Sequence, residues 1–498
     1  KKVPVIILAI CLLALLCIGL SYAWWRYTAI QDKTNVGISK CLKLELTNQS
    51  DEINLTNMYP ITDEEGRKLT PYTFTLTNTC TMSAEYTLNM EMLEGTTLNS
   101  KYLAVMVNNG NINLLSSYDT ATTEIDGSTE SRTIDTGILM PNGSKDYSIS
   151  LWMDKSVTLS DDAQNKTFKS KVVVDAVATE TAMDKIIASV DTTGKCPTVN
   201  DDGSVNVTEK EDTDGYLCKA KDAYGDSYYY RGNVTNNYVK FADKYWRIVR
   251  INGDGTVRVI YDGTSAHANG ESSSDRQIGT SAFNSSYNDN AYVGYMYGQT
   301  GASTYADAHA NTNDSTIKAY IDNWYKTNIV GTANEQYLAD NVFCNDRSIS
   351  TYTTSPNTKL GYGTNSTYYR WVYGPWSGTN YGNMTMMLTC PQKNDAFTVS
   401  DTTNGNGALT YPVGLLSTDE IVLAGGWSAN NSGYYLYSGQ YWWASSPFDF
   451  NGNYARVRSI GSSGYANYSD YVNNNNGVRP VFNLKAEVLA QGSGTVTD

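Results

Sequence analysis

The stretch YWWASSPFDFNGNYARVRSIGSSGYANYSDYVNNNNGVRPVFNL, residues 441–484, decides the fold of the second half of the chain. It opens on the pair Trp442 and Trp443 and closes on an apolar strand pattern, 478–484. Residues 448–476 between these ends are mostly Asn, Tyr, Ser, Gly and Asp. This composition fits either a long disordered loop or an ordered recognition surface, in which Tyr supplies contact area and Ser, Gly and Asn supply hydrogen bonds.

Apolar residues at intervals favour the ordered surface for segment 448–476. Ala455, Val457, Ile460 and Val472 interrupt the polar run and provide inward anchors. The flanking tryptophans and the closing strand fix both ends. We therefore predict that the segment is held against a core and presents its polar side chains outward.

The overall composition excludes some classes of function. The chain has 498 residues, 39 of them Tyr, with 37 Lys plus Arg against 51 Asp plus Glu and a net charge of −14. The length predicts about two to four domains. An acidic chain is a poor partner for nucleic acid, which requires clustered Lys and Arg. Asn, Ser, Thr, Gly and Tyr dominate, a polar uncharged profile typical of secreted β-proteins.

The first 25 residues read as an export or anchoring segment. Residues 3–20 carry no charge, follow two lysines and precede a tryptophan pair. At ~1.5 Å per residue this run reaches ~27 Å, close to the hydrocarbon thickness of a bilayer. Ser21–Ala23 also suits a signal peptidase, so residues 1–25 are either a cleaved signal peptide or a transmembrane anchor. Both alternatives predict an extracellular, cell-surface or membrane-anchored protein, with the membrane as a partner only when the segment is retained.

Six of the eight cysteines lie beyond this segment. Six cysteines allow 15 pairings. Sequence order and domain assignment favour three disulfides in an oxidising compartment, and six free thiols are the alternative. The expected pairs are Cys41–Cys80, Cys196–Cys218 and Cys344–Cys390.

Residues 38–178 show the alternation of half-buried strands, with turn signals between them and no long helical period. This pattern predicts an antiparallel β-sandwich of immunoglobulin-like size. A short helix, 181–190, and a linker rich in Asp, Thr and Gly, 199–215, are expected within residues 179–227. The clearest alternating positions are Tyr72, Phe74 and Leu76; Tyr86, Leu88, Met90 and Met92; Tyr147, Ile149, Leu151 and Met153; and Phe168 and Val172 to Val174.

Residues 228–488 predict a second, mixed domain. A hairpin is expected over 245–261, with its turn at 252–255. A helix capped by Asp314 or Ser315 runs through Trp324, and the sequence from Ser417 to Glu420 has the form of a capping box that starts another helix. The fold class is therefore mostly β with some α+β.

Motifs for catalysis are missing from the sequence. It contains no G-x-S-x-G, Walker A, H-E-x-x-H, EF-hand or dinucleotide-binding pattern. Its two histidines, His267 and His309, lie in a polar segment without an acidic or cysteine cluster in sequence, so structural or incidental surface roles are expected. We predict no enzyme activity, no cofactor and no assigned metal ligand. Asp201–Gly203 resembles half of a calcium loop whose other ligands are missing, so calcium binding is left open.

The chain resembles the variable proteins of diversity-generating retroelements, whose C-terminal domain has the C-type lectin fold shared with formylglycine-generating enzymes. The W-W-x-x-S-P opening at 442–447, the polar run after it and the closing Gly477–Pro480 carry this resemblance, which covers about residues 228–485. The hairpin 245–261, the helix around Trp324, residues 344–347 and residues 414–417 resemble variants of this domain in surface proteins of gut Firmicutes. Residues 21–25 and 59–66 are similar to exported sandwich domains of the camelysin and biofilm-matrix-fibre group.

The resemblance implies a surface-displayed protein of a Gram-positive bacterium, in which adenine-templated mutagenesis diversifies residues of segment 448–476 while strands hold the backbone. The sandwich would act as a stalk, and the ligand would be a protein or another surface molecule. The sugar-binding motifs of calcium-dependent lectins are absent. The implied ligand-contacting residues are Asp449, Asn451, Asn453, Tyr454, Arg456, Arg458, Ser459, Ser462, Ser463, Tyr465, Asn467, Tyr468, Asp470, Tyr471, Asn473 and Asn474.

Two other functions remain open at this stage. A structural fibre, matrix or adhesin subunit without diversification is suggested by the N-terminal half alone. A formylglycine-generating type of enzyme is the remote alternative, because those enzymes depend on a pair of cysteines late in the domain and no cysteine follows Cys390 here.

Overall fold

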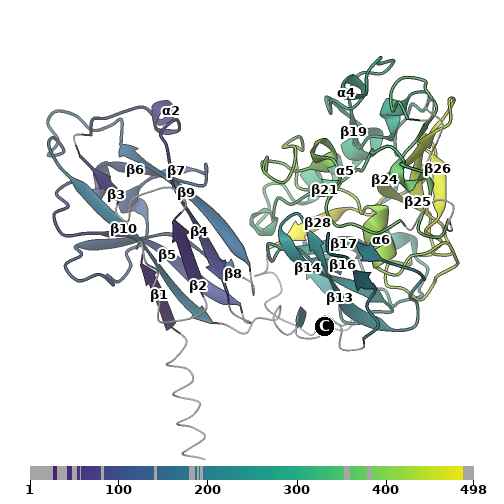
Figure 1. Ribbon diagram of the computed structural model, residues 1–498, viewed down its shortest axis with the longest axis horizontal. Helices are drawn as coiled ribbons and strands as arrows, with labels where there is room; N and C mark the ends of the chain where they lie inside the picture. The colour runs from purple at the N-terminus through teal and green to yellow at the C-terminus, as the bar shows by residue number, and fades with distance from the viewer. Residues whose placement is uncertain are drawn as a thin grey trace, which may run out of the picture. The chain divides into compact units, whose positions relative to one another are not determined.

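The computed structural model divides the chain into two compact units, Lys1–Asp184 and Lys185–Asp498 (Figure 1). It describes residues 26–30, 42–46, 53–56, 58–79, 83–139, 143–178, 186–187, 190, 194–352, 359–377 and 384–485. The expected signal or anchor segment, the Cys41–Cys80 pair and most of the expected helix 181–190 lie outside these residues. None of the helices in the described part is long and apolar enough to cross a membrane.

Unit 1 is built from two antiparallel five-stranded sheets. The first has the order β1 (Arg26–Ile30), β10 (Phe168–Ala178), β5 (Ala84–Met92) and β8 (Glu130–Leu139), with β3 (Ile53–Leu55) also paired to β10. The second has the order β2 (Leu42–Leu46), β4 (Tyr72–Asn78), β9 (Ser144–Met153), β6 (Leu103–Val107) and β7 (Ile112–Leu114). A single helical turn, α2 (Asp63–Gly66), begins at a capping box formed by Thr62 and Glu65.

One hydrophobic core lies between the two sheets of unit 1. Phe74 and Leu76 from β4 and Leu88 and Met90 from β5 belong to the same buried cluster. Because successive side chains of a strand point to opposite faces, the alternating positions of the sequence place every second residue in this core. The strands predicted from alternation in residues 72–174 are confirmed.

Unit 2 contains two six-stranded sheets and short accessory strands. The first sheet has the order β13 (Gly215–Asp222), β14 (Gly225–Gly232), β16 (Lys244–Ile251), β17 (Val257–Gly263) and β28 (Val481–Leu484), with β15 (Tyr238–Phe241) paired to β16. The second has the order β18 (Thr280–Ala282), β27 (Asn475–Gly477), β24 (Trp442–Phe450), β25 (Ala455–Ile460) and β26 (Tyr468–Tyr471), with β22 (Thr367–Tyr368) paired to β24. The short pairs are β11 (Thr198–Val199) with β12 (Val205–Asn206), β19 (Met296–Tyr297) with β20 (Asn313–Asp314), and β21 (Phe343–Cys344) with β23 (Ala396–Phe397).

The α-helices of unit 2 that the structure describes from end to end are α4 (Tyr305–Ala308), α5 (Thr316–Asn328) and α6 (Thr418–Leu423), and residues Ile186 and Ile187 are also helical. Ser315 caps α5, and the capping box of Ser417 and Glu420 starts α6, so both predicted helices and their caps are confirmed. The predicted hairpin 245–261 is β16 and β17. Its Trp246 stacks on Phe482 of β28, with ring centroids 4.7 Å apart, which joins the closing strand of the sequence to the hairpin.

Strand β13 lies within residues 179–227, the stretch expected to be a helix and linker. Its residues pair with β14 along the whole strand, and Tyr216, Cys218 and Ala220 are buried on one face. The Asp and Thr residues before β13 concealed this short alternating pattern. Unit 2 therefore begins before residue 228.

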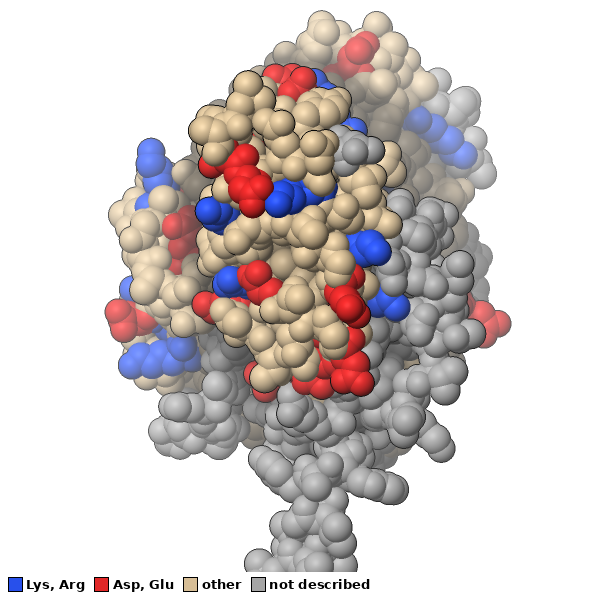
Figure 2. Space-filling model, turned by 90° about the vertical axis from the view of Figure 1, so that its left-hand side faces the viewer, with Lys and Arg blue, Asp and Glu red and all other residues tan. Residues whose placement is uncertain are grey.

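The described surface drawn in Figure 2 is mostly uncharged. Figure 2 shows acidic and basic side chains scattered among uncharged residues over the described part of one face. This distribution agrees with the low fraction of charged residues, 18%.

Candidate functional site

Segment 448–476 forms one end of the second sheet of unit 2. Strand β24 pairs with β25, and β25 pairs with β26, both antiparallel, so β26 is the edge strand of that sheet. Ala455, Val457, Ile460 and Val472 are fully buried. The four apolar residues thus anchor the segment, as the sequence predicts.

The implied ligand-contacting residues divide into three groups by burial. Eight of them are exposed: Asn451, Asn453, Tyr454, Ser462, Tyr468, Tyr471, Asn473 and Asn474. Five are half-buried: Arg456, Ser463, Tyr465, Asn467 and Asp470. Three are buried: Asp449, Arg458 and Ser459.

Asp449 is buried because it forms an internal ion pair. Arg456 donates Nε and Nη2 to the two carboxylate oxygens of Asp449, at 2.7 and 2.5 Å. These hydrogen bonds to Asp449 raise the pKa of Arg456. The guanidinium also lies over the ring of Phe448, 4.8 Å from its centroid. The carboxylate of Asp449 is thus engaged inside the protein and is not part of a contact surface.

Arg458 is also directed inward. Its guanidinium donates to the main-chain carbonyl of Trp371 and to Oδ1 of Asn467. It lies over the rings of Phe448 and Trp376, at 4.6 and 5.6 Å from their centroids. Burial lowers the pKa of Arg458 to about 9. Neighbouring Ser459 faces the core side of β25 and is fully buried, so neither side chain can reach a partner in this conformation.

Five exposed tyrosines gather around β26, and we call them the tyrosine ridge: Tyr287, Tyr441, Tyr454, Tyr468 and Tyr471. Each ring is between 37% and 43% exposed. Tyr454 stacks on Tyr287, with centroids 5.1 Å apart, and packs against Tyr471 at 4.9 Å. Tyr441 meets Tyr468 edge to face at 5.3 Å. The ridge therefore consists of a cluster of three rings and a pair.

Two members of the ridge, Tyr287 and Tyr441, were missed by sequence reasoning because they lie outside segment 448–476. The composition around Tyr287, Asn284-Ser285-Ser286-Tyr287-Asn288, matches that of the segment. This similarity in composition was the one signal in the sequence that pointed to Tyr287 as part of the same surface. Its position beside Tyr454 depends on contacts between residues more than 160 positions apart.

Local hydrogen bonds occupy the main-chain groups of Tyr471 at the free edge of β26. The main-chain N–H of Tyr471 donates to Oδ1 of Asp470 at 2.9 Å, and the N–H of Asn474 donates to the carbonyl of Tyr471 at 2.9 Å. Asp470 also accepts from the side chains of Asn474 and Asn476. An edge strand with unpaired N–H and C=O groups can pair with another chain. These bonds occupy the main-chain N–H and C=O groups of Tyr471. Recognition at this part of the edge therefore depends mainly on side chains.

The turn between β24 and β25 is formed by the side chain of Asn451. Its Oδ1 accepts the main-chain N–H groups of Asn453 and Tyr454, at 3.0 and 2.9 Å. Gly452 in this turn has φ +92°, a conformation that favours glycine. Although Asn451 is exposed, its carbonyl oxygen is therefore committed to the turn.

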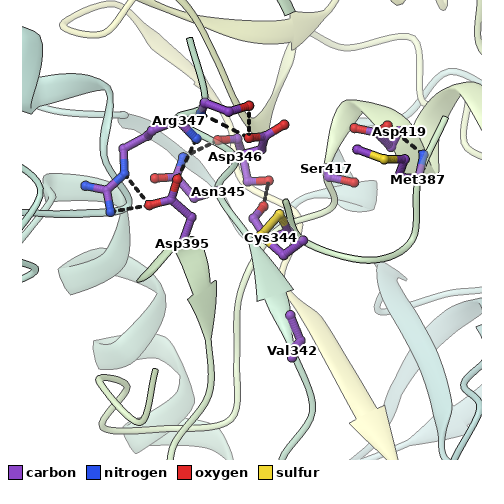
Figure 3. Close-up of a disulfide and its surroundings, with 12 residues drawn as sticks. Val342, Cys344, Asn345, Asp346, Arg347, Met387, Asp395, Ser417 and Asp419 are labelled. Atoms are coloured by element: carbon purple, nitrogen blue, oxygen red, sulfur yellow. Dashed lines mark hydrogen bonds and ion pairs between the residues drawn. A yellow bond between two sulfur atoms is a disulfide. The ribbon is translucent and has the colours of Figure 1, made fainter. Parts of the chain in front are cut away.

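The predicted disulfides Cys196–Cys218 and Cys344–Cys390 are present. The second is linked to the start of β24 by two side chains: Ser445 donates Oγ to the carbonyl of Cys344 at 2.6 Å, and Asn345 donates Nδ2 to the carbonyl of Ser445 at 2.5 Å. Beside them, Arg347 forms a buried ion pair with Asp395 (Figure 3). This cluster holds the strand from which segment 448–476 begins.

A second buried ionic cluster lies at the start of α6. Oε1 of Glu420 lies 3.2 Å from Nε of Arg250 and 2.6 Å from Nε of Arg258, while Oε2 accepts the main-chain N–H of Ser417 at 3.0 Å. The cavity that these arginines line has a volume of about 10 Å³, no more than one water occupies. The cluster is therefore structural and offers no room for a ligand.

Both histidines are buried, which corrects the expectation of an incidental surface role and supports the structural one. Nδ1 and Nε2 of His267 lie 2.8 and 3.0 Å from the carboxylates of Glu271 and Asp275. Burial lowers the pKa of His309 to about 2. Neither histidine belongs to a metal site: within the described ranges, no three His, Cys, Asp or Glu side chains are placed to hold a metal ion.

Comparisons with known proteins give no family for this chain. No protein-family model matches the sequence, and no curated protein is similar to it. Among solved structures, a weak similarity is to the binding domain of botulinum neurotoxin serotype D, with a TM-score of 0.12 and 9% identity. The match covers 49% of this chain and 66% of that one, just under two thirds. A similarity this weak carries no argument about fold or function.

Proposed function

We propose that this protein is a bacterial cell-surface binding protein that displays a recognition surface diversified by a retroelement. Unit 1 is then an immunoglobulin-like stalk, and unit 2 is a ligand-binding domain of the C-type lectin fold. The partner is a protein or another surface molecule, and neither catalysis, a cofactor nor nucleic acid has a part in the proposal. The two disulfides are consistent with an extracellular protein, and the membrane is a partner if residues 1–25 are retained.

One observation carries the proposal: segment 448–476 combines buried apolar residues with exposed polar and tyrosine residues, most of which lie in the turns that join its strands. Ala455, Val457 and Ile460 are fully buried, whereas eight of the polar and tyrosine residues implied by the resemblance are exposed. Outward side chains on such a scaffold can change without disturbing the core. Tyr adds large contact area at a low cost in conformational entropy.

Comparison of the coding DNA with neighbouring genomic sequence tests the diversification. We expect a near-repeat of the DNA that encodes segment 448–476, differing mainly at adenines, and an adjacent reverse transcriptase gene. The absence of both from a complete genome would contradict the proposal. The segment would then be a fixed surface.

Sequencing this gene in many isolates of one strain tests the role of each position. Substitutions should concentrate at exposed positions such as Tyr454, Tyr468 and Tyr471, and the buried Asp449, Arg458 and Ser459 should stay constant. Equal variation at buried and exposed positions would argue against selection on a displayed surface. The matched control is a polar, Tyr-rich stretch elsewhere in unit 2, residues 224–230, where no excess of substitutions is expected.

A further inference from the structure

Two residues of the tyrosine ridge lie outside segment 448–476, to which the proposed diversification is confined. Tyr287 and Tyr441 are 37% and 43% exposed, as much as the ridge tyrosines of segment 448–476. They are encoded outside the segment, so they stay constant when the segment changes.

Main-chain hydrogen bonds fix both residues against the ends of the segment. The N–H of Ala455 donates to the carbonyl of Tyr287 at 2.7 Å, and the N–H of Asn284 donates to the carbonyl of Val472 at 2.9 Å. The N–H of Gly477 donates to the carbonyl of Tyr441 at 2.8 Å. Because these bonds involve backbone atoms, they persist when exposed side chains of the segment are replaced. The main-chain positions of Tyr287 and Tyr441 therefore do not depend on the side chains of the segment, although their rings also contact Tyr454 and Tyr468.

The ridge lies on both sides of a sheet edge. Tyr471 is opposite Arg456 and Tyr468 is opposite Ser459 in the β25–β26 register, so the two tyrosines leave the edge strand on opposite faces. Three residue steps of about 3.3 Å separate their clusters by about 10 Å along the strand. Small ligands bind in concave pockets, whereas these side chains project from the two faces of a sheet edge. This arrangement fits a groove in a larger partner.

The chemistry of the ridge favours a protein over a glycan or a polyanion. Tyr454 stacks on Tyr287 and packs against Tyr471 at an interplanar angle of 57°. Contacts within the cluster therefore already use part of the ring surface on which sugars stack. The nearby charges are engaged, Arg456 with Asp449 and Asp470 with asparagines. Exposed hydroxyls on apolar rings suit the mixed polar and apolar surface of a folded protein.

We propose that Tyr287 and Tyr441 are constant contact residues of the recognition surface, and that the partner is a folded protein whose groove receives the tyrosine ridge. This inference rests on the proposed function and adds to it. The constant rings supply a part of the binding energy common to all sequence variants. The changing residues between and around them supply specificity.

The test is a selection from a library of the full chain displayed on yeast. Codons for seven exposed positions are randomised: Asn453, Tyr454, Ser462, Tyr468, Tyr471, Asn473 and Asn474. Lysozyme is the protein probe and dextran the glycan probe. We expect lysozyme binders and no dextran binders, and dextran binders alone would overturn the assignment of a protein partner.

Alanine variants of the selected binders then test the constant tyrosines. Tyr287→Ala and Tyr441→Ala should each weaken lysozyme binding about tenfold in most independent binders, with Tyr→Phe giving a smaller loss. Tyr59→Ala is the control, because Tyr59 is 74% exposed in unit 1. Thermal unfolding of each variant checks that the fold is intact.

The outcomes separate the two proposals. Unchanged affinity in both alanine variants would overturn the role of the constant tyrosines and leave the proposed function standing. The proposed function itself would fail if the library gave no binder to either probe. It would also fail if restoring the natural residues at the seven positions left lysozyme affinity unchanged.

Discussion

At the scale of single residues, Glu420 connects α6 to strands β16 and β17 of unit 2. Its carboxylate is 6% exposed and lies between the guanidinium groups of Arg250 and Arg258 while it also completes the capping box of α6. Burial lowers the pKa of Arg258 to about 10 even with Glu420 in place. Removal of the carboxylate leaves that cation without its nearest counter-charge.

We predict that Glu420→Gln lowers the free energy of unfolding by about 3–5 kcal/mol, the range for breaking a buried ion pair on one side. Urea denaturation followed by tryptophan fluorescence measures it. The control is Glu64→Gln, because the Glu64 side chain is 83% exposed in its pair with Lys68 and exposed pairs contribute about 0–1 kcal/mol. Equal effects of the two substitutions would show that the cluster at α6 contributes no more than a surface pair.

His309 gives a pH dependence whose sign follows from its burial. It packs against Tyr305, with ring centroids 3.7 Å apart, and donates Nε2–H to the carbonyl of Gly361 at 3.0 Å. Burial lowers the pKa of His309 in the folded state to about 2, from its ordinary value of 6.5. Below the unfolded pKa, the unfolded chain binds a proton that the native state does not. The stability that neutral, buried His309 contributes is therefore present above pH 6.5 and is lost as the pH falls toward 2.

We predict that the wild-type protein loses about 2–3 kcal/mol of stability more than His309→Gln does between about pH 7.5 and pH 4.5, since the glutamine does not titrate. Denaturation curves of both proteins at several pH values measure the difference. Carboxylates titrate alike in the two proteins and cancel. Parallel curves over this range would mean that His309 becomes protonated in the native state.

At the scale of elements, the disulfide Cys344–Cys390 supports strand β24. It closes a loop between residues 46 apart in sequence, and Ser445 and Asn345 connect it to the strand. We predict that the double variant Cys344→Ala/Cys390→Ala lowers the free energy of unfolding by about 4 kcal/mol through the greater entropy of the unfolded chain. Amide hydrogen exchange at 442–446 should rise more than exchange in β16 and β17.

The pair Cys196–Cys218 provides the comparison for this prediction. It closes a shorter loop, between residues 22 apart, and belongs to strand β13 of the other sheet. Its replacement by two alanines should cost about 3 kcal/mol without faster exchange at 442–446. Faster exchange there in both double variants would show a general loosening of unit 2 rather than local support of β24.

Elements were predictable from sequence where a local pattern determines them. The hairpin 245–261 follows from alternation and a turn, and α5 and α6 follow from their caps at Ser315 and Ser417. The burial of Arg458 was not predictable, because it depends on Trp371 and Trp376, which are about 80 residues away in sequence. The constant tyrosines of the ridge were missed for the same reason. Local pattern specifies strands and helices, whereas long-range packing decides which of their polar residues face the solvent.

At the scale of the whole molecule, the chain has separate cores in its two units. The cluster of unit 1 includes Leu76 and Leu88, and a cluster of unit 2 includes Trp371 and Leu423. A unit with its own core unfolds cooperatively by itself. We predict two calorimetric transitions in the full chain, and Glu420→Gln should lower the temperature of only one. A single transition that moves as a whole would contradict independent unfolding.

The occupied main-chain groups of Tyr471 at the edge of β26 have a consequence for how freely such a surface can evolve. Each new sequence of an exposed strand carries a risk of self-association into insoluble aggregates, because open strand edges pair with one another. Asp470 and Asn474 block the Tyr471 groups of this edge with local bonds. Replacement of the other exposed side chains does not remove these bonds, so we expect such variants to remain soluble. We expect substitution of Asp470 to lower the soluble yield, even though its side chain is half-buried and partly accessible.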